Sequence, residues 1–177
     1  IGDAELEMGT QNGDAGQAYD ISNAAGARYI GLKLTSNHGG FRTGFAEVAF
    51  SDVADPDAIT PGEIGPPDPP VEPGEGKVVP IAEVFAFHQG DSFDANGSVL
   101  KIADGSGMAK VDPEDPSTWT ISSTAWADDW QGFSADNSAD NTWAIIDLGA
   151  PTIGLDQMYL WNVQEGNALD RGTSTFD

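Results

Sequence analysis

The sequence predicts an all-β protein, a β-sandwich without long helices. Apolar and polar residues alternate with period two in several short runs, which is the pattern of strands that bury one face. The chain holds 22 glycines and 11 prolines, residues that favour turns and short strands. The nearest helical candidate, "IADGSGMAK" at residues 102–110, is interrupted by two glycines, which disfavour a helix interior. These observations favour a sandwich over a helical fold.

Residues 28–50 have the pattern of a β-hairpin. Two apolar rows flank a glycine-rich turn at residues 37–40, so both arms alternate as half-buried strands do. Only 27 residues precede this segment, too few to build the domain that such a hairpin would close. We therefore expect its partner strands to come later in the sequence. The rows are Ile30, Leu32 and Leu34 before the turn and Ala46, Val48 and Phe50 after it.

Residues 53–77 have the composition of a linker. Seven prolines favour an extended polyproline II conformation, and the acidic residues between them repel one another. We expect residues 55–76 to be exposed and to carry no regular secondary structure, because almost no apolar side chain is available there for burial.

Residues 78–177 have the pattern of a second β-rich region. Its candidate strands are "VVPIAEVFAF" (78–87), "TWAIIDLG" (142–149) and "QMYLWNV" (157–163). The region ends at "DRGTSTFD", which has the composition of a strand beginning. We therefore expect residues 28–50 to complete the sandwich that this region begins. The apolar rows that need a facing sheet are Ala144, Ile146 and Leu148, and Met158 and Leu160.

Taken in the order 78–177 and then 1–52, the chain resembles one discoidin-like module, related to the coagulation factor 5/8 type C domains. The resemblance rests on "VLKIADGSGM", "STWTISSTAW", "AIIDLGAPTIGLDQMYLWNVQEGNALDRGTSTFD" and "ARYIGLKLTSNHGGFRTGFAEVAF". It implies a galactose-binding-like jelly roll. Residues 78–177 would be its N-terminal part and residues 1–52 its C-terminal part, with 53–77 as linker. The two parts would pair within one chain or with a neighbouring chain. Three arrangements remain possible: a stretch cut from a tandem array of modules, a subunit that donates strands to its neighbour, and a circularly permuted domain that closes on itself.

The resemblance implies a structural Ca²⁺ site. Asp104 matches the acidic residue of the family's early loop, and Glu47 matches the closing glutamate. Ser106 and the carbonyl groups of Ile102 and Met108 would complete a shell of hard oxygen ligands, which Ca²⁺ prefers. The alternative is that Asp104 only caps a turn and that Glu47 only faces solvent.

The resemblance also implies a glycan-binding rim with an aromatic platform and polar side chains. The alternative is a solvated loop whose aromatic rings are tucked inward, because a β-sandwich normally buries one or two tryptophans. Trp143 or Trp161 is expected to take that core position. The candidate ligand-binding residues are Trp126, Trp130, Arg171, Asn167 and His38.

Composition and motifs exclude several functions. The 29 acidic and 7 basic residues give a net charge of −22, which repels nucleic acid and anionic membranes. No run of 18 apolar residues exists that would insert into a bilayer, and there is no cysteine for a disulfide, a thiolate metal site or a nucleophile. Asp128 and Asp129 are adjacent and would point to opposite faces of a strand, so they form a poor catalytic pair. We expect no enzymatic activity.

These features predict a secreted, extracellular protein of a bacterial cell surface with a structural or assembly role. Its partners would be copies of itself or adjacent modules, joined by strand complementation in a head-to-tail filament or a tandem array. The alternative is a carbohydrate-binding adhesion module. The sequence leaves the ligand open, and also whether the sandwich closes within one chain.

Overall fold

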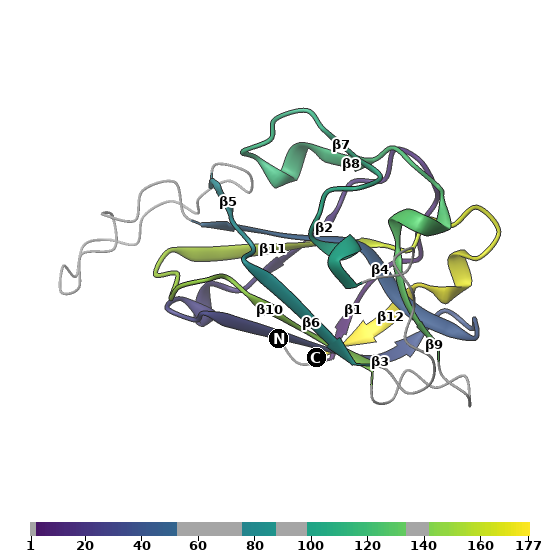
Figure 1. Cartoon of the computed structure of the whole chain (residues 1–177), viewed down its shortest axis with the longest axis horizontal. Helices are drawn as coiled ribbons and strands as arrows, with labels where there is room; N and C mark the ends of the chain where they lie inside the picture. Colours follow the sequence, from purple (N-terminus) through teal and green to yellow (C-terminus); the bar gives the residue numbers. More distant parts are fainter. Residues whose placement is uncertain (1–2, 53–75, 88–98, 134–141) are drawn as a thin grey trace.

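The computed structural model describes residues 3–52, 76–87, 99–133 and 142–177. It confirms the all-β expectation, because the strands pair antiparallel and the helical turns of the described part are short 3-10 segments. Two sheets face each other across an apolar core (Figure 1). The first sheet has the order β1 (Ala4–Glu5), β12 (Thr173–Phe176), β3 (Tyr29–Asn37), β10 (Thr142–Asp147) and β6 (Glu83–Phe87).

The second sheet is built around one long strand. β4 (Arg42–Asp52) pairs with β11 (Leu155–Asn162) along most of its length. A separate two-stranded sheet consists of β7 (Met108–Lys110) and β8 (Trp119–Ile121). The remaining strands of the second sheet are β2 (Gln17–Asp20) beside β11, and β5 (Val78–Val79) and β9 (Trp130–Phe133) beside β4.

The prediction that residues 28–50 form a β-hairpin is wrong. β3 belongs to the first sheet and β4 to the second, so the glycine-rich turn between them crosses from one sheet to the other. The physical reason is that alternation shows which face of a strand is buried, but not which strand lies beside it. The first row faces the core together with Val48 and Phe50 of the second row, from opposite sides, whereas Ala46 belongs to the cluster on the outward face of the second sheet.

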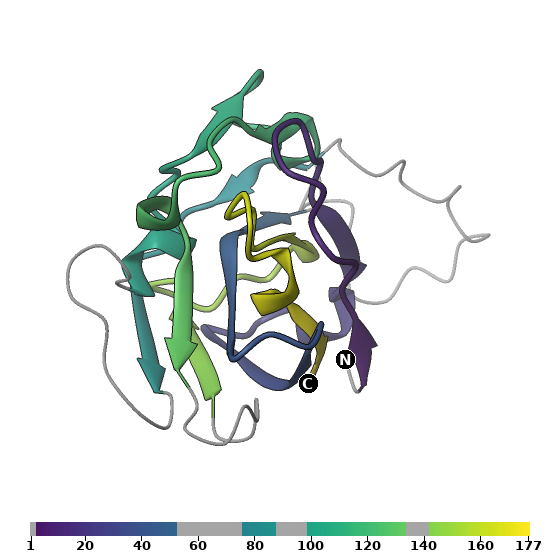
Figure 2. The ribbon, with the colours of Figure 1, turned by 90° about the vertical axis from the view of Figure 1, so that its right-hand side faces the viewer.

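β3 and β4 lie between strands of residues 76–177 of the same chain, whereas β1 and β2 are edge strands. β3 pairs with β10 on one side and with β12 on the other, while β4 pairs with β11. β1 pairs with β12, which brings the beginning and the end of the chain together (Figure 2). The core therefore draws on both parts of the sequence.

The predicted apolar rows are buried, with one partial exception. Leu32, Leu34, Ala144 and Ile146 are at most 3% exposed, whereas Ile30 is only half-buried. In the second sheet the alternation is less informative, because β4 is buried on both faces from Thr43 to Ser51. A second apolar cluster covers the outward face of that sheet and consists of Ala46, Ala49, Trp119, Ile121, Tyr159 and Trp161.

The predicted linker conformation at residues 55–76 falls almost entirely outside the described residues. Its two flanks lie side by side: the amide of Asp52 donates to the carbonyl of Lys77, and the amide of Lys77 donates to Asp52 Oδ1, both at 3.0 Å. In the described part of the chain, no helix is long and apolar enough to cross a membrane.

Candidate functional site

The structure brings Glu47 to the loop that carries Asp104. Glu47 lies on the outward face of β4, at a register shift where β4 and β11 slip relative to each other, and it is 1% exposed. The amide of Gly105 donates to Glu47 Oε2 at 3.2 Å. The loop can turn toward β4 because Gly105 and Gly107 have φ angles of +72° and +74°, which favour glycine. The alternative of a solvent-facing Glu47 is therefore wrong.

Asp104 has partners of its own in this loop. Its Oδ1 accepts from the amide of Ser106 at 2.7 Å, which is the turn-capping arrangement, and its Oδ2 lies 3.1 Å from Lys101 Nζ. Ile102 ends the 3-10 turn η3 (Val99–Ile102) and Met108 begins β7, so both backbones belong to the same loop region. The predicted Ca²⁺ ligands are thus close in the fold.

Burial controls the ionisation of Glu47. Removal from water raises the pKa of its carboxyl to about 8, with Asp104 raising it further and Lys110 opposing the shift. Lys110 Nζ lies 3.8 Å from the centroid of the Trp119 ring, a cation–π contact. Glu47, Lys110 and Trp119 line an open depression of about 270 Å³ over the outward face of the second sheet.

The loop suits Ca²⁺ in part. Within the described ranges, no three His, Cys, Asp or Glu side chains gather to hold a metal ion, so backbone oxygens would have to supplement Glu47 and Asp104. The buried Glu47 carboxylate and the glycine-bent loop fit the oxygen chemistry of this ion. Lys101 would have to leave Asp104 to make room for it.

A second candidate site lies at one rim of the sandwich, around Arg171. Its Nη1 donates to Glu165 Oε2 at 2.7 Å, and its guanidinium carbon lies 4.6 Å from the centroid of the Phe41 ring. The amide of Gly40 donates to the carbonyl of Asp170 at 2.8 Å. A Cβ atom at Gly40 would lie 2.8 Å from that backbone, so only glycine permits this approach of the two loops.

The structure places the predicted glycan-binding residues unequally. Asn167 is exposed on the loop that leads to Arg171, and Trp126 is half-buried in the 3-10 turn η5 (Trp126–Asp128). His38 is half-buried, with its Nε2 3.0 Å from the carbonyl oxygen of Leu6.

The prediction that Trp130 belongs to a glycan-binding surface is wrong, because this side chain is not at the surface. It is 1% exposed and its ring packs beside Phe45, with the centroids 6.0 Å apart, since the inward face of β9 points into the core. Trp161 takes the expected buried position, at 1% exposure.

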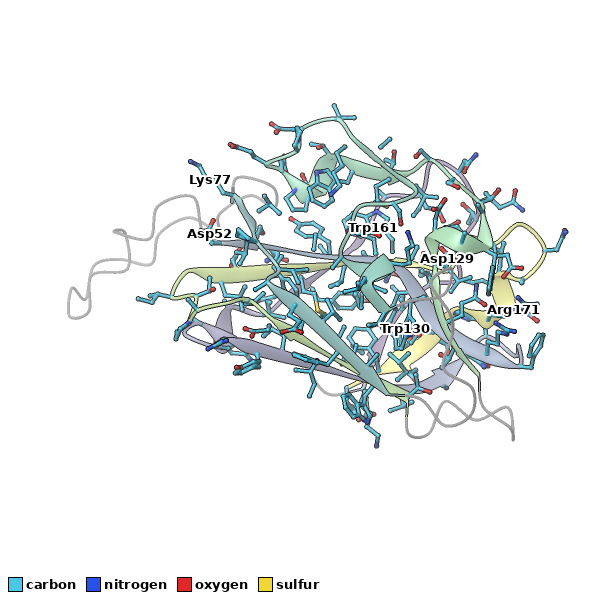
Figure 3. The ribbon with its side chains drawn as sticks, viewed as in Figure 1. Asp52, Lys77, Asp129, Trp130, Trp161 and Arg171 are labelled. Atoms are coloured by element: carbon cyan, nitrogen blue, oxygen red, sulfur yellow. The ribbon has the colours of Figure 1, made fainter. Side chains whose placement is uncertain are left out.

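Sequence reasoning missed a buried carboxyl group at the same rim. Asp129 is 3% exposed and accepts from the amide of Gln164 at 3.3 Å. Burial raises its pKa to about 7, and the neighbouring charges of Glu165 and Asp128 act in the same direction. Figure 3 shows Asp129 and Arg171 toward the end of the molecule opposite to Asp52 and Lys77. Nothing in the sequence distinguishes Asp129 from Asp128, because the contact of Asp129 with Gln164 joins residues 35 positions apart.

The two adjacent carboxyl groups of this rim, Asp128 and Asp129, do not share a hydrogen-bond partner. Asp128 Oδ2 accepts from Ser123 Oγ at 2.6 Å, while Asp129 faces Gln164, so the adjacent carboxyls have separate partners. The absence of catalytic activity stays a prediction. Comparisons with protein-family models, with curated proteins and with solved structures found no match, so the residues and their geometry alone support the functions proposed for this chain.

Proposed function

We propose that this chain is a non-catalytic, extracellular structural protein, a discoidin-like jelly-roll module whose copies assemble in a tandem surface array or a head-to-tail filament. The observation that carries the proposal is the position of β3 between β10 and β12. Residues 3–52 thus supply inner strands to a sandwich whose other strands lie in residues 76–177. Because the strands of one sandwich are divided between two parts of the sequence, residues 3–52 can be supplied by the same chain or by another copy.

The energetics require that the two parts meet. Removing residues 3–52 would expose the side chains that pack on Leu34, Phe45 and Phe50, all three of which are fully buried. Each large apolar side chain left in water costs about 1.5–3 kcal/mol, and a domain has only about 5–15 kcal/mol of net stability. Neither part can remain alone in water, so exchange between copies is a low-cost route to assembly.

Cysteine trapping tests this proposal. Gly31 and Ile145 are direct cross-strand partners on β3 and β10, and a Cβ added at Gly31 meets open space. Because the chain has no cysteine, a Gly31→Cys chain and an Ile145→Cys chain can be unfolded together, refolded and oxidised. Assembly by strand exchange predicts disulfide-linked dimers on a non-reducing gel, increasing with protein concentration.

The matched control is the pair Phe85→Cys and Ile145→Cys in one chain. These positions are also cross-strand partners, but both lie within residues 76–177. Their disulfide must therefore form within one chain whether or not strands are exchanged. A control that oxidises fully, beside a mixture that gives only monomers at every concentration, would overturn assembly by exchange.

We also propose that Glu47 and Asp104 hold a structural Ca²⁺ ion, supported by their convergence on one loop. An ion bound only to the folded state stabilises it by mass action. Added Ca²⁺ should raise the thermal midpoint of the parent chain, and a chelator should reverse the rise. Glu47→Gln should remove this response while Glu83→Gln, an exposed residue of β6, should keep it. A midpoint that ignores Ca²⁺ in the parent chain rejects the site.

Carbohydrate binding is a second candidate function, favoured by the exposed Phe41 ring beside Arg171. An aromatic face and a guanidinium together suit a sugar ring and its polar substituents. A glycan array with the purified chain tests this. Arg171→Gln should lose the signal, and Arg28→Gln, whose side chain binds Asp147 instead, should retain it. An array without signal for the parent chain removes this candidate.

A further inference from the structure

A small polar pocket lies where the segment before β2 crosses the end of β11. Its volume is about 150 Å³, and its walls come from two stretches that are far apart in the sequence. Leu6 and Leu160 supply apolar wall, whereas Glu7 and Asp14 supply two carboxyl groups. No lysine, arginine or histidine among the described residues lines the pocket, so no positive charge in its walls balances these two acids.

Gln164 holds one wall of this pocket in place. Its Oε1 accepts from the amide of Gln11 at 2.6 Å, and its Nε2 donates to Asp14 Oδ2 at 3.0 Å. Gln11 has a φ angle of +87°, which is uncommon for a residue other than glycine. A Cβ atom at Gly9 would lie 2.6 Å from the carbonyl oxygen of Val163, so only glycine lets the wall approach this closely. The pocket is therefore formed before any ligand arrives.

One buried donor at the pocket has no acceptor. Trp161 borders the pocket and is 1% exposed, and its indole Nε1 has no hydrogen-bond partner. A Cβ atom at Gly16 would lie 2.7 Å from Cε2 of this ring, the carbon that is bonded to the nitrogen. Ala15 and Gln17, on either side of Gly16, both line the pocket. The N–H edge of the indole thus lies at the pocket wall, where an acceptor would recover the free energy lost by burying it.

These groups restrict the chemistry of a ligand. An anion would be repelled by Glu7 and Asp14. A metal ion cannot accept from the Trp161 N–H group, and the described residues gather no three His, Cys, Asp or Glu side chains to hold one. A neutral polyol would supply the acceptor but no positive charge for the two carboxylates. A protonated amine with a neighbouring hydroxyl group meets both needs, because the ammonium donates to carboxylates while the hydroxyl oxygen accepts from the indole.

We propose that this pocket binds a small protonated amino alcohol, the group that ethanolamine shares with amino sugars such as glucosamine. The ammonium lies beside Glu7 and Asp14, and the hydroxyl oxygen accepts from Trp161 Nε1. The pocket has the volume of about five water molecules at about 30 Å³ each, which is room for ethanolamine. The net charge of −22 also attracts cations to the chain. This inference is independent of the functions proposed above.

The indole N–H signals of the tryptophans test the proposal by nuclear magnetic resonance. Added ethanolamine should move the Trp161 signal in a saturable way, because its N–H group gains an acceptor. Trp119 is the internal control, since its Nε1 already donates to the carbonyl of Asp112 at 2.7 Å and its signal should stay in place. Trp161→Phe identifies the signal by removing it. A Trp161 signal that ignores ethanolamine and glucosamine at every concentration would overturn the proposal.

Matched compounds test which groups of the ligand are recognised. Ethylene glycol lacks the ammonium, ethylammonium lacks the oxygen, and glycolate carries the opposite charge. Each should bind about tenfold more weakly than ethanolamine, or less, in titration calorimetry, because each lacks a hydrogen bond or a charge contact. Ethylammonium that binds as tightly as ethanolamine would overturn the role of the indole. Binding of glucosamine assigns the pocket to an amino sugar, and its exclusion assigns the pocket to a free amino alcohol.

A matched pair of variants tests the indole N–H group itself. Trp161→Phe keeps an aromatic ring beside Trp119 and removes the donor, so it should weaken ethanolamine binding about tenfold. Trp143→Phe makes the same change on β10 of the other sheet and should leave the affinity unchanged. Equal affinities of Trp161→Phe and the parent chain would contradict the proposal. The shift of the Trp161 signal in the parent chain decides the question even where this variant does not fold.

Discussion

The outward faces of the two sheets differ, although the same alternating pattern predicts both. On the first sheet, Tyr29 and Phe85 are 54% and 45% exposed. On the second sheet, Glu47 and Trp161 are each 1% exposed. The difference arises because β7, β8 and the segment before β2 cover the second sheet, as Trp119 stacking on Trp161 at 6.0 Å shows.

The pKa values of carboxyl groups on the two sheets are shifted in opposite directions. At the end of β10 in the first sheet, Arg28 binds Asp147 with two contacts of 2.8 Å and holds the pKa of that carboxyl below its usual value. On the covered second sheet, burial raises the pKa of Glu47. Asp147 is itself only 6% exposed, so the arginine contact decides its direction. A carboxyl group with a bidentate arginine partner becomes more acidic, while one buried without such a partner becomes less acidic.

The largest effect is expected at Trp161. Trp161→Ala should lower the free energy of unfolding by about 3–5 kcal/mol, because it removes a fully packed ring between Trp119 and Tyr159. Trp143→Ala, on the half-buried outward face of β10, is the matched control and should lose less than half as much. Urea unfolding measures both. Equal losses would show that the first sheet is covered as well.

An intermediate effect is expected at Asp129, beside β9 of the second sheet. Its pKa is raised to about 7 when folded, so the folded chain keeps a proton that the unfolded chain releases. Stability should therefore fall as the pH rises from about 4 to about 7. Asp129→Asn should flatten this dependence and gain about 2–4 kcal/mol over the parent at pH 8, since one pKa unit corresponds to about 1.4 kcal/mol.

Unfolding curves from pH 4 to pH 8 measure this effect. Asp170→Asn, an exposed residue of the same rim, controls for the loss of one negative charge. If Asp170→Asn gained as much at pH 8 as Asp129→Asn, general charge repulsion would explain the result instead of burial.

The smallest effect is expected at Phe85, on the open face of the first sheet. Phe85→Thr should change the free energy of unfolding by less than about 0.5 kcal/mol, because nearly half of the side chain already lies in water and threonine suits a strand. Thermal unfolding measures this change. A loss above about 2 kcal/mol would reveal a covering layer on this face too.

The sequence by itself determined the all-β class and the inward apolar rows. Leu32, Leu34, Ala144 and Ile146 were identifiable because a strand places alternate side chains on opposite faces, a local property of the chain. The chemistry of the turns was local too, as at Gly105 and Gly107. Glu47 and the Asp104 loop lie together in the structure, while a Ca²⁺ ion held between them stays a prediction.

Only the tertiary structure decided which strands are neighbours and which faces are covered. The crossing of residues 28–50 from one sheet to the other, the burial of Trp130 and the raised pKa of Asp129 all depend on segments far away in the sequence. Alternation carries no information about the partner of a strand, and desolvation depends on what packs above a residue. Both are properties of the assembled core, where the covering layers exclude water from one sheet and leave the other open.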